Sequence, residues 1–287
     1  MEIINSWQFN LILSIVFIVL FTQFFKLASK NQKNDGAMAV LAQIISGVSV
    51  LVLIPFFEFK FPTDWKVWGL LGLAIIFYAI NDRIHATTRK NLDVSTENIL
   101  NQLSKVFMIV TGIVFFKEDI ILIKILGGLL IILSNVLLVF NKGKFVFNKY
   151  VLLQLLRTLF YTIALSLDVG ISEQFNLPIY IALTFLVPAL LIILFERIPP
   201  KKIVEEYKEG NKKAITITGL SWGLSVIFGL RAYQYGEVTT IAPLSALALL
   251  FNVIFAYVFL KEKNDIIKKV VAAIGVIAGV ILISLAS

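Results

Sequence analysis

A cluster of polar side chains interrupts the apolar stretch at residues 77–91, and it is the first place where this sequence could do chemistry. Tyr78, Asp82, His85 and Arg89 recur at helical spacing and share one face of the expected helix, with Arg83 beside them. A buried carboxylate can take up a proton, an arginine can bind an anion, and a histidine titrates near neutral pH. The pattern predicts a site for a polar or ionisable ligand.

A second polar stripe follows after a short turn. Glu97, Asn101 and Lys105 are spaced four residues apart on one helical face, with Asn98 and Gln102 beside them. Because the two expected helices are joined by so short a turn, their polar stripes can face one another. The second stripe therefore extends the predicted site of the first.

Two interpretations of these charges stay open. Arg83 and Lys105 could bind a polar or charged substrate while Asp82 or Glu97 exchanges a proton. Alternatively, Asp82–Arg83 and Glu97–Lys105 could be neutralising pairs that only hold the helices together. His85, the only histidine, could switch with pH or could be a hydrogen-bonded structural residue. We favour a substrate cavity because the amides extend the stripe beyond what charge pairing needs.

The second half of the chain adds two candidates, Arg157 and Asn252, within apolar stretches. The predicted substrate-binding residues are Tyr78, Asp82, Arg83, Glu97, Asn98, Asn101, Gln102, Lys105, Arg157 and Asn252. The predicted proton-coupling candidates are Glu97, Asp82 and His85. The sequence predicts no catalytic residue and no metal site.

The elements that must position these residues are membrane-spanning helices. Hydrophobic residues make up 59% of the 287 residues and charged residues 15%, against about 25% in soluble domains. A bilayer-crossing helix needs roughly 20 mainly apolar residues. We expect ten spans, at about 8–28, 36–57, 66–90, 94–116, 120–140, 150–169, 177–195, 214–235, 239–260 and 266–285. The polar segment 196–213 is expected to form a loop or a short surface helix.

Several classes of protein are excluded or disfavoured by what the sequence lacks. With no cysteine, the chain has no disulfide and no thiolate metal site. No phosphate-binding GxxxxGK[ST] loop and no HExxH occurs, so neither ATP-driven transport nor a zinc-protease motif is supported, and no cofactor is expected. The net charge of +8 is explained by lysine and arginine in loops, without nucleic acid as a partner.

An internal repeat organises the chain. When the sequence is shifted by 144 positions, residues 93–140 align with residues 237–284 without a gap, and 13 of 48 positions are identical. Lys117–Glu118 matches Lys261–Glu262 in this alignment. The repeat predicts two five-helix halves, 1–145 and 146–287. Because five is odd, the second half must be inserted upside down, which is the architecture of alternating-access carriers.

The basic residues support this inversion. Loops after odd-numbered spans hold 18 of the 26 lysines and arginines, whereas loops after even-numbered spans and the termini hold 4. By the positive-inside rule, the odd loops are cytoplasmic and both termini lie outside. Gly127–Gly128 and the pair Gly275 and Gly279 are expected to let the two halves pack closely.

The pattern resembles the EamA branch of the drug/metabolite transporter superfamily. The resemblance covers nearly the whole chain and rests on AYQYGEVTTIAPLSAL at 232–247 and FLKE at 259–262. YAINDR, NLDVST and NQLSK in the first half are similar to the corresponding stretch of nucleotide-sugar transporters. There a lysine directly follows Gln-Leu, whereas here Ser104 precedes Lys105. The resemblance implies that spans one, three, four, six, eight and nine line a central cavity.

We therefore expect an all-α polytopic membrane protein that is a secondary transporter and not an enzyme. Its substrate is expected to be a small polar metabolite, an amino acid or similar, exported by proton or substrate exchange. The alternative is a nucleotide-sugar or organophosphate antiporter, which would be favoured if Arg83, Lys105 and Arg157 converge. A bacterial plasma membrane is the expected location. The expected partners are a small-molecule substrate and the lipid bilayer, with a monomer favoured over a homodimer.

Overall fold

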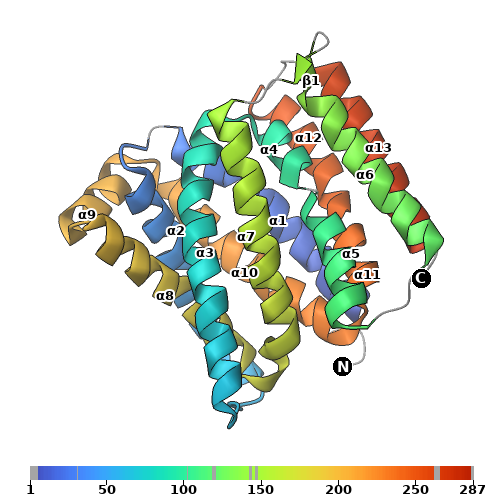
Figure 1. Cartoon of the computed structure of the whole chain (residues 1–287). Coiled ribbons are helices and arrows are strands. Elements are labelled where there is room, and N and C mark those ends of the chain that lie inside the picture. The colour runs from blue at the N-terminus through green and yellow to red at the C-terminus, as the bar shows by residue number, and fades with distance from the viewer. Residues whose placement is uncertain are drawn as a thin grey trace.

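The computed structural model describes residues 6–30, 32–101, 103–117, 121–141, 144–145, 148–261 and 266–285 (Figure 1). The elements within these ranges are almost all helices. They are α1 (Trp7–Ser29), α2 (Asp35–Leu51), η2 (Ile54–Phe56), α3 (Trp65–Asn91), α4 (Val94–Asn101), α5 (Leu103–Phe115), α6 (Leu122–Val139), β1 (Phe140–Asn141), β2 (Lys144–Phe145), α7 (Lys149–Ile171), η3 (Ser172–Gln174), α8 (Leu177–Glu196), α9 (Pro200–Glu209), α10 (Lys212–Tyr235), α11 (Val238–Leu244), η4 (Ser245–Leu247), α12 (Ala248–Val258) and α13 (Ile266–Ser284).

Short polar side chains fix where several of these helices begin. Asn34 Oδ1 accepts a hydrogen bond of 2.8 Å from the backbone N–H of Ala37 at the start of α2. Asn148 and Asn211 do the same at the starts of α7 and α10. Such caps satisfy backbone donors that have no partner within the helix. The loop residues between the apolar stretches therefore set the helix boundaries.

Helices occupy every range in which a span is expected. Seven stretches are long and apolar enough to cross a bilayer, namely Trp7–Ser29, Trp65–Asn91, Thr96–Phe115, Lys149–Gln174, Leu177–Glu196, Lys212–Tyr235 and Ile266–Ile283. The helix α2 is a shorter apolar helix, and the ninth expected span is broken into α11, η4 and α12. The all-helical membrane class is thus confirmed, whereas the count of ten spans stays a prediction. The expected surface helix is α9, which lies beside α2 and α8 in Figure 1.

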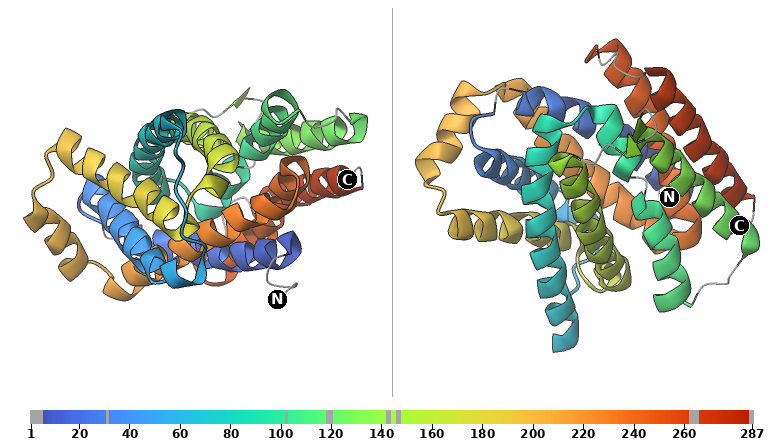
Figure 2. Two further views of the ribbon diagram at one scale, coloured as in Figure 1. Left: turned by 90° about the horizontal axis from the view of Figure 1, so that it is seen from below. Right: turned by 45° about the horizontal axis from the view of Figure 1, so that its top comes forward.

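The contacts between helices occur in equivalent sets: when each helix is replaced by its counterpart in the other half, the same kind of contact is found. The packing of α1 against α10 is matched by the packing of α3 against α7, and α2 against α10 is matched by α3 against α8. Two equivalent pairs meet directly, α2 with α8 and α6 with α13. Figures 1 and 2 show α6 and α13 side by side at the edge of the molecule. The two halves therefore contact each other through several helix pairs.

Glycine contacts show that equivalent helices run in opposite directions. A Cβ at Gly127 would lie 2.5 Å from the carbonyl oxygen of Gly279, and a Cβ at Gly275 would lie 2.2 Å from Ser134 Oγ. Rising numbers along α6 thus meet falling numbers along α13. The predicted close packing of the halves through these glycines is confirmed, except that Gly128 faces open space.

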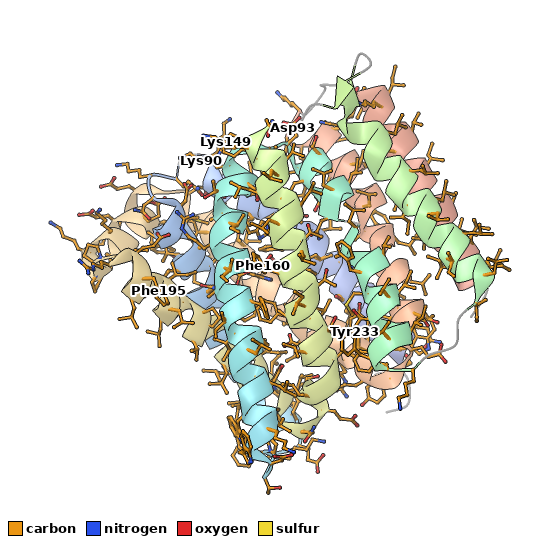
Figure 3. The ribbon with its side chains drawn as sticks, viewed as in Figure 1. Lys90, Asp93, Lys149, Phe160, Phe195 and Tyr233 are labelled. Atoms are coloured by element: carbon orange, nitrogen blue, oxygen red, sulfur yellow. The ribbon has the colours of Figure 1, made fainter. Side chains whose placement is uncertain are left out.

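Two short strands, β1 and β2, lie between the helices of the two predicted halves. Phe140 pairs with Phe145 and Asn141 pairs with Lys144 in an antiparallel arrangement. The predicted boundary at residues 145 and 146 lies partly outside the described residues, so the limits 1–145 and 146–287 stay a prediction. Figure 3 shows Lys90, Asp93 and Lys149 at the same end of the bundle. We call this end, where Lys90 and Lys149 lie, the lysine-rich end.

Candidate functional site

A cavity of about 180 Å³ lies between the two halves of the bundle. Side chains from α1, α3, α4, α5, α7, α10, α11 and α12 line it, together with two residues of α8. Its ionisable and amide lining residues are Tyr78, Asn81, Asp82, His85, Arg89, Glu97, Asn98, Asn101, Lys105, Arg157, Tyr161, Tyr233 and Asn252. The two polar stripes of the first half do face one another across this space. The helices are those that the family resemblance implies, with a small addition from α8.

Glu97 is the centre of a buried charge cluster. Its Oε1 lies 2.9 Å from His85 Nε2 and 3.1 Å from a guanidinium nitrogen of Arg157, and its Oε2 lies 3.1 Å from Arg89 Nε. All four side chains are at most 6% exposed. Since Arg157 comes from the second half of the chain, the Glu97 cluster joins the two halves. One carboxylate there balances two guanidinium groups.

Asp82 lies beside this cluster without joining it. Gln43 Nε2 donates to Asp82 Oδ2 at 2.7 Å, and Asn81 Nδ2 donates to Asp82 Oδ1 at 2.6 Å. The other amide atom of Asn81 accepts from Arg157 Nε at 3.1 Å. Within the described part of the chain, Asp82 forms no ion pair. A carboxylate held only by amides can gain or lose a proton without breaking an ion pair.

Neither of the neutralising pairs considered from the sequence forms. Arg83 pairs with Glu196 of α8 and donates to Thr87 Oγ1 at 2.8 Å, away from the cavity lining. Lys105 lines the cavity, and among the described residues no carboxylate lies within ion-pair distance of it. The structure thus separates the four charges that adjacent sequence positions suggested would pair.

The remaining predicted residues divide into cavity-lining and supporting positions. Asn101 lines the cavity and accepts from Thr158 Oγ1 at 3.3 Å. Asn252 also lines it, and its side-chain oxygen accepts from Thr22 Oγ1 and from Gln23 Nε2. Asn98 is buried in the wall. Gln102 lies outside the described residues.

Sequence reasoning placed Arg89 on the helical face of Tyr78, Asp82 and His85 but did not include it among the predicted site residues. Arg89 is 1% exposed, although its place near the end of α3 suggested a loop position. Its helical spacing from Asp82 and His85 was the available signal. Lys269 is a second case: it is 2% exposed and its Nζ lies 3.0 Å from Asp93. Arg89 follows an apolar stretch and Lys269 precedes one, and only packing decides that they turn inward.

The lysine-rich end of the cavity is held together by contacts between helices. Lys26 Nζ of α1 donates to the carbonyl oxygens of Arg89 at 2.9 Å and Leu92 at 2.6 Å, and so caps the end of α3. The Lys269–Asp93 pair ties α13 to the turn before α4. These contacts and the Glu97 cluster lie toward the same end. Within the described residues, no group of three or more His, Cys, Asp or Glu side chains could hold a metal ion.

Comparison with known proteins identifies a family whose model matches the chain twice. The model of the EamA-like transporter family matches residues 5–140 and, a second time, residues 148–285. One solved crystal structure shares the fold with a TM-score of 0.64 at 14% identity, over 96% of this chain and 97% of its own. No curated protein matches the sequence. The two family matches coincide with the two halves that the 144-residue repeat predicts.

Proposed function

Because this chain belongs to the EamA-like transporter family, and is therefore a multi-pass membrane transporter of small molecules, we propose that it carries a small polar metabolite with an anionic group. An amino acid is the simplest example. The substrate binds in the cavity between the halves and crosses by alternating access. The observation that carries this proposal is Lys105, a cation of the cavity wall without a carboxylate partner among the described residues.

Lys105 is suited to bind a carboxylate of the substrate. A charge away from water is costly unless an opposite charge or several hydrogen bonds compensate it. The nearest acidic candidate on the same stripe, Glu97, is already shared by Arg89 and Arg157. A substrate carboxylate would supply the missing partner, while the amide of Asn101 lies one turn away on the same face.

The cavity also has an apolar and aromatic side for the rest of the substrate. Phe21 stacks on Trp222 with ring centroids 5.0 Å apart, and both line the cavity. His85 lies edge-on to Phe25 and Phe21. An amphipathic molecule of amino-acid size would place its charged group at Lys105 and its side chain against these rings.

Asp82 is the best supported of the three proton-coupling candidates. Protonation of Glu97 would leave Arg89 and Arg157 without their shared counter-ion, and His85 is enclosed by rings and by the same cluster. Protonation of Asp82 changes only hydrogen bonds to two neutral amides. We propose that Asp82 takes up or releases the proton that is exchanged for substrate. Inverted halves that rock about the cavity would carry both across the membrane.

The organophosphate alternative has less support. It needs Arg83, Lys105 and Arg157 to converge on one anionic ligand. Arg83 is engaged with Glu196, and Arg157 with Glu97. Among the described residues of the cavity lining, Lys105 is the cation without a carboxylate partner, and a single cation favours a carboxylate over a diphosphate. The direction is proposed to be export from the cytoplasm across a bacterial plasma membrane, with the lysine-rich loops inside.

A transport assay with purified protein tests the proposal. Thermal-shift screening in detergent against amino acids and phosphorylated metabolites selects substrates, and counterflow in proteoliposomes with and without a pH gradient measures transport. Lys105→Met should weaken binding of a selected amino acid roughly 10- to 100-fold, since a charge-assisted hydrogen bond contributes about 1.5–3 kcal/mol. Lys66→Met, at an exposed lysine of α3, is the matched control. Equal transport by both variants would refute the anchoring role of Lys105.

A further inference from the structure

A further buried carboxylate, besides Glu97 and Asp82, lies behind the cavity wall. Asp168 of α7 is 1% exposed. Tyr78 of α3 donates its hydroxyl to Asp168 Oδ2 at 2.5 Å, and Tyr180 of α8 donates its hydroxyl to Asp168 Oδ1 at 2.6 Å. The carboxylate therefore joins three helices. No step of the proposed transport mechanism uses it.

The groups facing Asp168 are neutral. The titratable side chains around it are tyrosines: Tyr78 from α3, Tyr180 from α8 and Tyr161 from α7 itself, while α10 contributes Tyr233 next to Tyr161. Among the described residues, no lysine, arginine or histidine pairs with Asp168. The remaining neighbours belong to an apolar cluster that includes Leu165, Ile171 and Ile181.

This arrangement makes the charged state of Asp168 costly. An ionisable side chain inside a membrane protein usually pairs with an opposite charge, because the desolvation of an isolated carboxylate is only partly repaid by hydrogen bonds. Two hydroxyl donors compensate in part. A carboxyl group that is buried without a counter-ion among the described residues is a candidate for taking up a proton.

Tyr78 links this carboxylate to the cavity. The phenol of Tyr78 lines the cavity, whereas Tyr180 is fully buried outside its lining. When Asp168 is ionised, the Tyr78 hydroxyl donates to Oδ2 and presents only lone pairs to the cavity. When Oδ2 carries a proton, that proton can be donated to the Tyr78 oxygen, and the phenol O–H is released to donate into the cavity. The Tyr180 hydrogen bond to Oδ1 is the same in both states.

We propose that Asp168 is a proton-binding site that controls, through Tyr78, whether the cavity wall donates a hydrogen bond to a bound anion. Toward the cavity, protonation of Asp168 converts the Tyr78 hydroxyl from a hydrogen-bond acceptor into a donor. An anionic oxygen in the cavity therefore binds better when Asp168 is neutral. The proton enters and leaves as such, and no other bond is made or broken. By linkage, a bound anion must favour protonation of Asp168 by the same factor. The anionic ligand rests on the proposed function; the protonation of Asp168 does not.

Infrared spectroscopy of the full chain in lipid vesicles tests both parts. A protonated carboxylic acid has a carbonyl stretch that an ionised carboxylate lacks, and this band is followed as pH is raised. The anion is methanesulfonate, whose charge is constant over the titration. The wild-type band should contain a component that disappears as pH rises and is missing in Asp168→Asn. A component that both proteins share belongs to another carboxyl group, such as Asp82. Saturating methanesulfonate should move the midpoint upward by about one pH unit, corresponding to a tenfold preference.

Two phenylalanine variants separate the cavity link from simple hydrogen-bond loss. Tyr78→Phe and Tyr180→Phe each remove one hydrogen bond to Asp168, but only Tyr78 lines the cavity. The methanesulfonate shift should persist in Tyr180→Phe and vanish in Tyr78→Phe. A titrating band that is the same in the wild type and in Asp168→Asn, an unmoved midpoint of the component assigned to Asp168, or equal loss of the shift in both phenylalanine variants would overturn the proposal. Because no transport is measured, failure of the proposed function is seen separately in the counterflow assay.

Discussion

Replacing Glu97 by glutamine is the sharpest test of how the two halves are held together. The sequence alone suggested Glu97 as a proton carrier, for which glutamine would leave folding intact. In the structure, its carboxylate is the shared counter-ion of Arg89 and Arg157, and it contacts His85. Glu97→Gln keeps the shape of the side chain and removes the charge. The two buried guanidinium groups then lose the carboxylate that they share.

The expected loss of stability follows from the burial of these groups. Arg89 and Arg157 are 1% and 5% exposed, and removing one partner of a buried ion pair costs about 3–5 kcal/mol. At 2–4 °C per kcal/mol for a chain of a few hundred residues, the melting temperature should fall on the order of 10 °C. The Arg83–Glu196 pair is about one third exposed. Glu196→Gln should therefore cost about 1 kcal/mol or less.

Thermal unfolding in one detergent, followed by tryptophan fluorescence, compares the two variants directly. A double variant, Glu97→Gln with Arg89→Gln, should recover part of the loss because it removes one of the two uncompensated charges. If Glu97→Gln melts no lower than Glu196→Gln, the Glu97 cluster is not the tie between the halves. Transport by a folded, fully stable Glu97→Gln protein would refute the reasoning in the same way.

Two further predictions concern helix packing and topology. Gly127→Ala should lower the melting temperature because its Cβ would lie 2.5 Å from the Gly279 carbonyl oxygen. Gly128 faces open space, so Gly128→Ala should be neutral or slightly stabilising. Equal melting temperatures of the two variants would contradict the antiparallel contact of α6 with α13. Single cysteines can be introduced without a background because the chain has none. Cysteines at Lys66 and Lys208 should react with a membrane-impermeant thiol reagent from opposite sides, with Lys66 outside; labelling from the same side would reject the inverted topology.

Local properties of the sequence were sufficient for the fold class. Apolar length gives the membrane helices, and the polar residues between them give the breaks. The shared Lys-Glu and Ile-Lys spacing reveals the duplication, and an odd number of helices in each copy requires inversion. The glycines of α6 and α13 meet in opposite directions as this requires. Helical periodicity likewise put Tyr78, Asp82 and His85 on one face, and all three line the cavity.

Only the tertiary structure decided which charges pair. Neighbouring positions suggested Asp82–Arg83 and Glu97–Lys105, yet Glu97 is paired with Arg157, 60 residues away, and Arg83 with Glu196, 113 residues away. Such partners depend on how each helix is rotated and which helix of the other half it meets, and no local pattern contains that information. Burial follows the same rule, since Arg89 is buried where the Glu97 carboxylate of another helix pairs with it.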